Sequence, residues 1–435
     1  MKRRQFFTTA AVASLGTIGG YGIGRARSVE QDPDSPVIET LGGMTLEEHR
    51  DKYRDDLFNR FLPNMDESVI DHENGGFMCA VNIQTGERTN DNKRAWYEGR
   101  GMWVYSFLFN NVEQDSRYLE IARKSKDFIL PLEPSGDEFW PTTISRDGEP
   151  LSGPGDIYGN LFIAEGLAEY SKGSGEREYY DRAREMVLSC FERYEDPSYS
   201  YRSDSLGIPN TRVVGHWMIF LRLVTQMLEH EADPQLEEIA DRCVDALLTG
   251  HLNSEYNLMN EYLNHDLSLP ENEYSNYSNT GHSIETLWMV MFEAERRQDN
   301  ELFQTARDLF KRHITVAQDA VYGGYFHQLE HVNDYNWGVN KVLWLQEEIL
   351  IGTLFLIEHT GDPWAQKVFA DTDAYVREKY TRPGYKFWTS GADRKLEEHN
   401  MVRAEHYHHP RQLMLNLLAV ERMIERGGRI TGRFA

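Results

Sequence analysis

The sequence predicts an all-α fold, because apolar residues recur at helical spacing along most of the chain and no stretch sustains a strict apolar/polar alternation. Local signals support this prediction. Asp233-Pro234 and Asp362-Pro363 each place a capping aspartate before a proline at the first helical position, and Gly427-Gly428 is a typical helix end. The helices that we expect are 45–62, 94–111, 116–131, 155–173, 176–193, 210–230, 234–250, 280–296, 300–318, 340–360, 362–379 and 410–427.

Short and long connections alternate between these helices, which indicates a ring of antiparallel helix pairs. Long loops inside a compact fold usually carry function. Two of them contain a Gly-Gly-aromatic turn, at Gly75-Gly76-Phe77 and at Gly323-Gly324-Tyr325, which hints at an internal repeat. The long connections are 63–93, 251–279, 319–339 and 380–409.

Composition narrows the classes of partner. The formal net charge of -24 argues against nucleic acid and anionic membranes, because an acidic surface repels both. The 9 Trp and 23 Tyr suit a cleft that stacks sugar rings and, equally, a large helical core. The three scattered cysteines, Cys79, Cys190 and Cys243, form neither a disulfide framework nor a zinc spacing, so we expect them in the core.

The N-terminus reads as a targeting segment. Residues 1–28 combine Lys2-Arg3-Arg4 with a weakly apolar run and resemble a twin-arginine export signal, so we expect a periplasmic protein. The apolar run is too short for a stable span of ~20 residues. A polar linker, 29–43, would then lead into a single catalytic domain, 44–435.

The stretch Asn279 to Trp288 is a candidate site. Asn279 is a natural cap, so His282 falls in the first turn of a helix, with Glu285 one turn later. The helix dipole disfavours a positive charge there, and we expect a neutral imidazole that accepts a proton. Taken alone, the stretch is explained more simply by a buried core histidine.

Two further helices carry mixed aromatic and charged faces. Trp96, Arg100 and Trp103 lie at spacings of four and three, which holds the arginine between aromatic rings. Such a guanidinium can bind sugar oxygens or an oxyanion, or simply pair with Glu98. Trp344 and Glu348 form an i, i+4 pair that suits a sugar site, although the Trp also fits a core and the Glu a solvated face.

Histidines cluster near the C-terminus, in Glu405-His406-Tyr407-His408-His409-Pro410-Arg411. We expect Pro410 to open the last helix, with His408 and His409 in extended backbone before it. A metal site there is a minor alternative, because no HExxH or CxxC spacing occurs. His216 is a further candidate that fits a core position equally well.

Together these groups suit proton transfer on carbon next to a sugar carbonyl. That reaction needs a positioned base, an opposing acid and a fixed cation or donor for the enediolate oxygen. It requires neither a hydride cofactor nor a metal, and no dinucleotide glycine fingerprint is present. We therefore expect no cofactor, and a small sugar or oligosaccharide as the substrate.

The motifs also carry a family resemblance. The chain resembles the N-acylglucosamine 2-epimerase family, which includes cellobiose 2-epimerases, mannose isomerases and sulfoquinovose isomerases. The similarity runs from about Leu46 to Met423. The motifs that carry it are Asn74-Gly75-Gly76-Phe77, Arg94-Ala95-Trp96-Tyr97-Glu98-Gly99-Arg100 with Trp103, Gly281-His282-Ser283-Ile284-Glu285 with Trp288, Trp344-Leu345-Gln346-Glu347-Glu348, and Tyr407-His408-His409-Pro410-Arg411.

This resemblance implies an (α/α)6 barrel with the site at its centre and a reaction through a cis-enediol(ate). It implies His282 and His408 as the acid/base pair. It also implies substrate-binding roles, in which Glu285 and Glu348 orient histidines or bind hydroxyls and Trp288 and Trp344 stack on the sugar. The residues with these implied roles are Arg100, His216, Glu285, Trp288, Trp344 and Glu348.

Three positions depart from the family pattern. Glu98 stands in place of a glutamine, Leu343 in place of a second tryptophan, and His409 in place of an apolar residue. The differences at Glu98 and Leu343 concern the choice of sugar more than the chemistry, and the difference at His409 leaves the catalytic role with His408.

Two other functions remain open on the sequence. The first is a glycoside hydrolase or lyase on the same toroid, with Glu285 and Glu348 flanking the scissile bond at a separation of ~5–9.5 Å. The second is a carbohydrate-binding protein without turnover. We expect a monomer or a homodimer.

Overall fold

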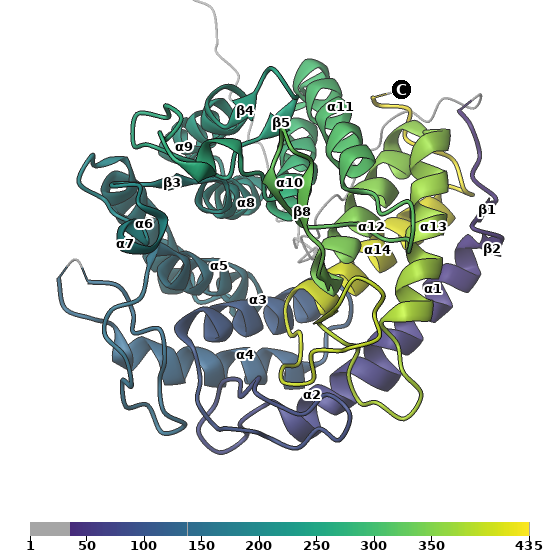
Figure 1. Ribbon diagram of the computed structural model, residues 1–435. Helices are drawn as coiled ribbons and strands as arrows, with labels where there is room; N and C mark the ends of the chain where they lie inside the picture. Colours follow the sequence, from purple (N-terminus) through teal and green to yellow (C-terminus); the bar gives the residue numbers. More distant parts are fainter. Residues whose placement is uncertain (1–34, 137, 435) are drawn as a thin grey trace, which may run out of the picture.

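The computed structural model describes residues 35–136 and 138–434, so the expected export segment 1–28 lies outside the described residues. In the described part, twelve helices form two concentric rings (Figure 1). The inner helices are α3 (Ala95–Asn111), α5 (Ile157–Ser174), α8 (Val214–His230), α10 (Thr280–Arg297), α12 (Leu343–Thr360) and α14 (His408–Glu425). The outer helices are α1 (Leu46–Arg54), α4 (Ser116–Ile129), α6 (Arg177–Glu195), α9 (Pro234–Asp245), α11 (Asn300–Ala317) and α13 (Pro363–Lys379).

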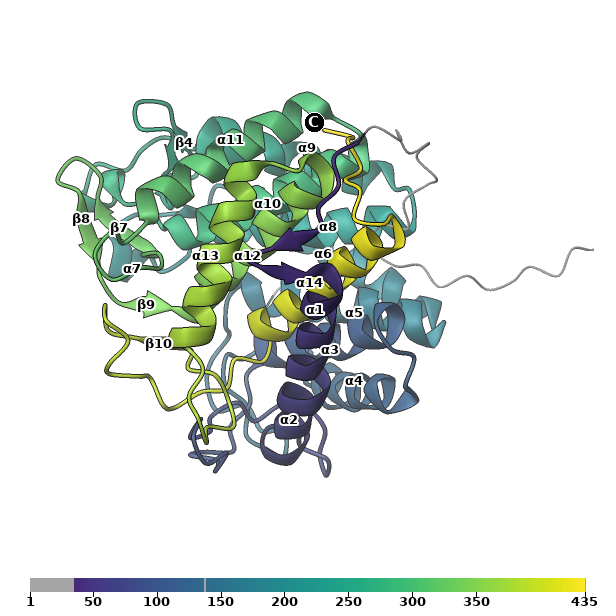
Figure 2. The same ribbon diagram turned by 90° about the vertical axis from the view of Figure 1, so that its right-hand side faces the viewer.

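Each inner helix packs against the next inner helix along the chain and against one antiparallel outer helix. The ring closes because α1, the first helix of the chain, is the outer partner of α14, the last (Figure 2). The architecture is therefore the expected (α/α)6 barrel, in which six helix pairs surround one axis.

Side-chain patterns explain which helix lies inside. Helix α12 is buried at every position from Leu345 to His359, as expected of a helix that is apolar on all sides. The outer helix α9 instead buries a single stripe at i, i+3, i+4 and i+7, which is the pattern of a helix with one face in water. That stripe consists of Leu236, Ile239, Ala240 and Cys243.

The local start and stop signals are confirmed. Asp233 accepts hydrogen bonds from the backbone N–H groups of Gln235 and Leu236, directly before Pro234. At the other end of the chain, Gly428 has a φ of +79° and donates its N–H to the carbonyl oxygen of Met423, which ends α14.

Several helix boundaries differ from the prediction; α8, for example, begins at Val214 rather than at 210, and α12 at Leu343 rather than at 340. Two further differences have a local cause. The first helical stretch continues beyond residue 62, through the π-helical segment Asp55–Phe61 into α2 (Leu62–Ser68), because Pro63 takes a first-turn position where no N–H is needed. Helix α14 begins at His408 rather than at Pro410, so both histidines lie in its first turn. Pro410 is tolerated because the first four N–H groups of a helix have no partner within it.

Ten short strands form five antiparallel pairs in the described part of the chain. Most of them gather at one end of the barrel, where the inner helices begin (Figure 2). With two to four residues each, they are too short to show an alternating pattern. The strands are β1 (Thr40–Leu41), β2 (Met44–Thr45), β3 (Arg212–Val213), β4 (Leu252–Asn253), β5 (Leu258–Met259), β6 (Tyr262–Leu263), β7 (Gln328–His331), β8 (Asn336–Gly338), β9 (Lys341–Val342) and β10 (Gly391–Ala392).

Two of these pairs link neighbouring inner helices. Strand β3 pairs with β6, which joins the segment before α8 to the loop before α10. Strand β9 pairs with β10, which joins the start of α12 to the loop before α14. The short strands therefore fix the first turns of the inner helices relative to one another.

The described part of the expected linker packs against the barrel. Leu41 is 1% exposed, and the N–H of Ile38 donates to the carbonyl oxygen of Gly428 at 2.8 Å. Residues 36–38 thus run beside the segment that follows α14, where Val37 pairs with Arg429 and the N–H of Ile430 donates to the carbonyl oxygen of Pro36.

Two long loops share one construction. Before α3, Nζ of Lys93 lies 3.0 Å from Asp71 and donates to the carbonyl oxygen of Gly75, while Arg146 binds Asp71 through two nitrogens. These contacts join Asp71, Gly75 and Lys93, in the loop before α3, to Arg146, in the connection between α4 and α5. They hold the Gly-Gly-aromatic turn against the start of α3.

The loop before α12 repeats these contacts. Nζ of Lys341 lies 2.9 Å from Asp319 and donates to the carbonyl oxygen of Gly323, while Arg394 binds Asp319 through two nitrogens at 2.9 Å. The repeated Gly-Gly-aromatic turn therefore marks a genuine internal structural repeat, as the sequence hinted.

Candidate active site

The residues expected to act together lie in the first two turns of the inner helices, at the end of the barrel that carries the long loops (Figure 2). His282 lies in the first turn of α10, and its N–H donates to the side-chain oxygen of Asn279, which caps the helix. The side chain of His282 is 28% exposed, so a solute can reach its ring.

Glu261 holds the ring of His282. Its Oε1 lies 2.8 Å from Nδ1 of His282, and its other carboxylate oxygen is buried without a partner. Burial lowers the pKa of His282, but the Glu261 carboxylate raises it more, and the net pKa lies above the ordinary value. The expectation that the helix dipole keeps this imidazole neutral is thus wrong, because a direct ion pair outweighs the dipole.

His408 has the opposite environment. Its Nδ1 lies 2.9 Å from Oε1 of Glu348 and 3.0 Å from Nη2 of Arg411. Burial, with a further contribution from the Arg411 guanidinium, lowers the pKa of His408 to about 3 despite the raising effect of Glu285. This ring is therefore neutral at every pH near neutrality.

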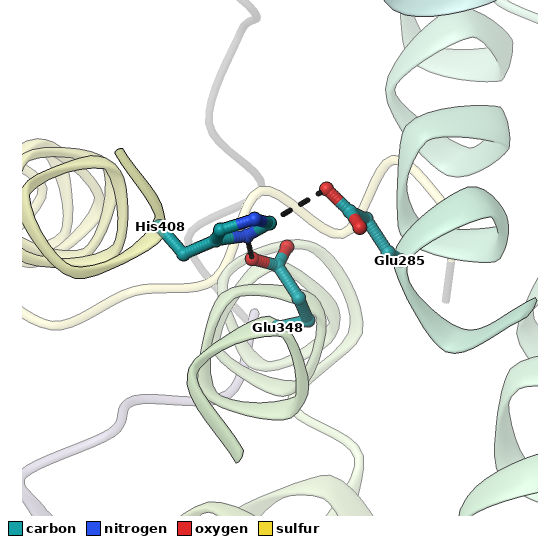
Figure 3. Close-up of side chains that lie close together, drawn as sticks. All are labelled: Glu285, Glu348 and His408. Carbon is teal, nitrogen blue, oxygen red and sulfur yellow. Dashed lines mark hydrogen bonds and ion pairs between the residues drawn. The ribbon is translucent and has the colours of Figure 1, made fainter. Parts of the chain in front are cut away.

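Two buried glutamates, Glu285 and Glu348, flank His408 (Figure 3). Arg411 connects their carboxylates. Its Nη2 lies 2.5 Å from Oε1 of Glu285 and 2.6 Å from Oε1 of Glu348. Glu348 also accepts a hydrogen bond from Nε1 of Trp288 at 2.8 Å. Every carboxylate of this cluster is thus bound to a cation or a donor.

The same cluster contains the set of side chains with metal-ligand spacing. The ligand-type atoms of Glu285, Glu348 and His408 lie within 4.8 Å of one another. Nη2 of Arg411 is within hydrogen-bond distance of all three residues, so its positive charge takes the place that a metal ion would need. The donor set therefore suits the guanidinium better than a divalent ion.

Trp344 lies between the two candidate histidines. Its ring centroid is 5.8 Å from that of His282 and 5.4 Å from that of His408, and its side chain is only partly buried. An apolar sugar face that stacks on this indole would lie within reach of both imidazoles.

Arg100 presents a cation without a counter-charge. Its guanidinium carbon lies 4.1 Å from the ring of Phe162, 4.6 Å from that of Tyr407 and 5.0 Å from that of Trp96. No ion pair joins it to any carboxylate among the described residues, and its Nε is buried without a partner. The alternative of a pairing with Glu98 does not occur, so donors of Arg100 remain available to a ligand.

Glu98 instead binds the Gly-Gly-aromatic loop. Its two oxygens accept hydrogen bonds from the N–H of Phe77 at 3.0 Å and from Oγ of Ser125 at 2.8 Å. Burial raises the pKa of Glu98 to about 7.

In the second copy of the internal repeat, a glutamine, Gln346, stands at the position that corresponds to Glu98. Glu98 follows Lys93 by the same five residues that separate Gln346 from Lys341. Gln346 both accepts from the N–H of Tyr325 and donates to the carbonyl oxygen of Tyr325. The positions that correspond in the two repeats are Trp96 and Trp344, Glu98 and Gln346, and Arg100 and Glu348.

Two expected sugar contacts are buried instead. His216 is 0% exposed and is enclosed by Tyr158 and Tyr201, whose ring centroids lie 4.4 and 4.6 Å away. Trp288 is 1% exposed beneath Glu348. In this conformation neither ring can stack on or bind a solute, because each is covered by the side chains that it packs against.

The two glutamates, Glu285 and Glu348, are not placed to contact a substrate directly. Glu348 is 0% and Glu285 is 2% exposed, and both are bound by Arg411. Their place supports an orienting role toward His408, one of the two roles that the resemblance implies.

Sequence reasoning missed two important groups, Glu261 and the bridging role of Arg411. Glu261 lies in the long connection 251–279, which was flagged only for its length, and Arg411 was part of a quoted motif. A third is Glu405, whose carboxylate accepts from the N–H groups of Tyr407 and His408 at 3.2 Å and so caps α14. An acid three residues before a helix start is a recognisable signal for such a cap.

The fold and the site define a class of protein: a helical-barrel enzyme of the sugar epimerase and isomerase type, with two differently poised histidines and a free arginine. Residues 75–411 match the family model described as N-acylglucosamine 2-epimerase (GlcNAc 2-epimerase), and the chain belongs to that family.

Relatives and solved structures agree with this assignment. The chain is 26% identical over 334 residues to the N-acylglucosamine 2-epimerase of Bos taurus, covering 73% of this chain and 78% of the bovine protein. It is 22% identical over 368 residues to the cellobiose 2-epimerase of Bacteroides fragilis, covering 78% and 91% of the two chains.

The fold is shared with solved structures. The cellobiose 2-epimerase from Bacillus thermoamylovorans B4167 superposes with a TM-score of 0.74 at 17% identity. The superposition covers 86% of this chain and 100% of the epimerase chain. A D-mannose isomerase superposes with a TM-score of 0.68 at 15% identity, covering 86% and 96%.

Proposed function

We propose that this enzyme acts on a free sugar or on the reducing end of an oligosaccharide, and that it moves the proton at C2 through a cis-enediol(ate). One observation carries the proposal. The two imidazoles that pack on Trp344 have opposite electrostatic partners, a carboxylate at His282 and a guanidinium with a carboxylate at His408.

These partners assign the histidines different starting states. With Nδ1–H of His408 donated to Glu348, the lone pair on Nε2 is free to take the C2 proton. With Nδ1–H of His282 donated to Glu261, the raised pKa favours the imidazolium, which presents a proton on Nε2. In the free enzyme, His408 is thus the base and His282 the acid.

The reaction then proceeds on the open-chain sugar. Nε2 of His408 takes the proton from C2, the C2–H electrons form the C1=C2 double bond, and the negative charge passes to O1. Donors of Arg100, which have no carboxylate partner among the described residues, stabilise that oxygen. A proton from His282 to the opposite face of C2 gives the epimer. Transfer of the O2 proton to O1, with delivery of a proton to C1 as the C2=O double bond forms, gives the ketose.

Exchange of the C2 proton tests this proposal. A panel of mono- and disaccharides in D2O is followed by NMR at C1 and C2 with the wild type, His282→Ala and His408→Ala. We expect exchange with at least one sugar and a loss of about 10²–10⁴-fold in each variant. The exposed His72 provides a matched control, His72→Ala, which should exchange at the wild-type rate. Equal exchange in all four proteins would refute the roles of both histidines.

The hydrolase alternative has no support in the geometry. Glu285 and Glu348 are buried, share Arg411 and have oxygens within 4.8 Å of each other, so they do not stand on two sides of a bond. Release of a monosaccharide from a disaccharide in the same NMR panel would restore this alternative, whereas a conversion without change of mass excludes it.

We further propose that the protein is exported to the periplasm by the twin-arginine route. The support is the basic and weakly apolar composition of residues 1–28. None of the described helices combines the length and apolarity that a membrane crossing needs. Replacement of Arg3 and Arg4 by lysine should retain the protein in the cytoplasmic fraction, and unchanged export would contradict the route.

A further inference from the structure

A cavity of about 190 Å³ lies outside the inner ring, behind the first turn of α14. It is bounded by the π-helical segment Asp55–Phe61 and the start of α2 on one side and by the loop after α13 on the other. His409 and Trp388 line it, with ring centroids 4.4 Å apart. This volume is sufficient for a small solute.

His409, which lines the cavity, belongs to a second His–Glu pair built from the same two helices as the first. His408 pairs with Glu348, whereas its neighbour His409 pairs with Glu347, with Nδ1 of His409 2.5 Å from Oε1 of Glu347. Glu347 is 0% exposed, and its second oxygen is buried without a partner. Because Nδ1 faces Glu347, Nε2 is the nitrogen that a ligand in the cavity can use.

Folding stability alone does not explain why the His409–Glu347 pair is present. A buried ion pair is at best a weak source of folding free energy, because desolvation offsets the attraction between the charges. The unpartnered oxygen of Glu347 adds a further cost. Burial raises the pKa of Glu347, and a protonated Glu347 that donates to Nδ1 of His409 leaves the ring N–H on Nε2, where it is a donor toward the cavity.

Uncompensated positive charge lines the same cavity. Arg382 forms no ion pair with any carboxylate in the described residues, and its Nε is buried without a partner. Its Nη2 contacts only the carbonyl oxygen of Leu396 and the ring of His399. Lys386 lines the cavity as well, and its single carboxylate partner, Glu67, lies at the surface.

The acids of the cavity do not cancel this charge. Asp56 lies 2.8 Å from Arg377, and Glu405 is bound by Arg403, so both are neutralised by cations that lie outside the lining. A cationic cavity stands out on a chain with a net charge of -24. Its charges attract an anion from solution.

We propose that this cavity is a second ligand site, which binds a small anion carrying a carboxylate or phosphate group. Arg382 and Lys386 form ion pairs with the anionic group, and Nε2 of His409 donates a hydrogen bond to it. The site is separate from the sugar site, because His408 and His409 pair with different glutamates and none of His282, Trp344 and His408 lines the cavity. The proposal does not depend on the reaction that the enzyme catalyses.

Calorimetric titration of the purified protein tests the site, with inorganic phosphate and D-gluconate as the two probes at constant ionic strength. We expect saturable binding of at least one probe, and the tighter probe identifies the anionic group. Arg382→Gln and Lys386→Gln should each weaken that binding by about tenfold or more. Lys367→Gln removes an equal charge from an exposed position on α13 and should leave the affinity unchanged.

A fourth variant separates the two sites. His282→Ala alters the sugar site alone, so phosphate or gluconate should bind it as they bind the wild type. If Arg382→Gln fails to fold because it loses the contact to Leu396, Lys386→Gln decides the question, since its partner Glu67 is 66% exposed. The absence of saturable binding, an affinity unchanged in both cavity variants, or a loss confined to His282→Ala would each overturn the proposal.

Discussion

Glu261 and His282 form a direct carboxylate–imidazole pair at the start of α10. Oε1 of Glu261 lies 2.8 Å from Nδ1 of His282, although the two residues come from a loop and from a helix start. No comparable carboxylate acts alone on His408, where Arg411 lies 3.0 Å from the same ring atom. The two imidazoles therefore have different electrostatic environments, which raise the pKa of His282 and lower that of His408.

Glu261→Gln should lower the pKa of His282, because the amide cannot balance the imidazolium charge. The pKa of His282 is raised in the folded protein. The stability that the Glu261–His282 ion pair adds is therefore fully present below the pKa of an ordinary histidine, and it is lost as the pH rises through the raised pKa of His282. The alkaline limb of kcat/KM should thus move to lower pH, with on the order of tenfold lower activity at neutral pH. Histidine NMR titration and pH–rate profiles measure both effects.

The exposed Glu255, in the same loop, provides the control for that variant. Glu255→Gln removes the same charge and should leave the profile unchanged. Identical profiles for Glu261→Gln and the wild type would show that the ion pair does not set the protonation of His282.

Arg411→Gln should destabilise the fold by about 3–5 kcal/mol, because it leaves two buried carboxylates without their cation. It should also raise the pKa of His408, which the guanidinium helps to lower. Urea unfolding measures the first effect and NMR titration of His408 the second. A stable variant with an unchanged His408 titration would contradict the bridging role of Arg411 between Glu285 and Glu348.

Glu98→Gln should stabilise the protein at neutral and alkaline pH. Burial raises the folded pKa of Glu98 from 4.5 to about 7, so the wild type is penalised as the pH rises through this window, whereas glutamine does not ionise. The full penalty is about 3 kcal/mol above pH 7 and vanishes below about pH 4.5. Urea unfolding at pH 5 and pH 8 should show a difference from the wild type that grows with pH. A constant difference would argue against ionisation of Glu98 in the folded state.

Arg100→Lys should lower kcat by on the order of 10²–10³-fold, because lysine keeps the charge but loses the planar donors that lie among three aromatic rings. C2 exchange rates and kcat on a responsive sugar give the measurement. Arg94 is exposed near the start of the same helix, so Arg94→Lys is the matched control with wild-type turnover. If both variants were equally active, Arg100 would have no role at the reacting oxygens.

The helices were predictable because their signals are local. The cap at Asp233 and the end at Gly428 are read from neighbouring residues, and the apolar stripes repeat within each helix. The short strands were not predictable from the sequence, because a pair such as β3 and β6 has two residues in each strand and joins segments fifty residues apart. Pro410 misled the prediction of the last helix start, because a proline is tolerated at several first-turn positions.

Within the site, spacing along a helix did not reveal depth in the barrel. His282 and Trp288 both belong to α10, but six residues correspond to about 9 Å along the axis, which carries Trp288 below the exposed end. His216 was also predicted to meet substrate. It lies in a first turn, yet tyrosine side chains from other segments cover it.

The sequence by itself determined the all-α class, the helix pairs, and the identity of the histidines, arginine and indole that meet at the barrel's end. Only the tertiary structure decided which partner each of them has: Glu261 for His282, Arg411 and Glu348 for His408, and aromatic rings but no carboxylate for Arg100 within the described part of the chain. The physical reason is that helix formation depends on neighbours along the chain. The protonation state of a buried ring depends on desolvation and on charges that the fold brings from distant segments.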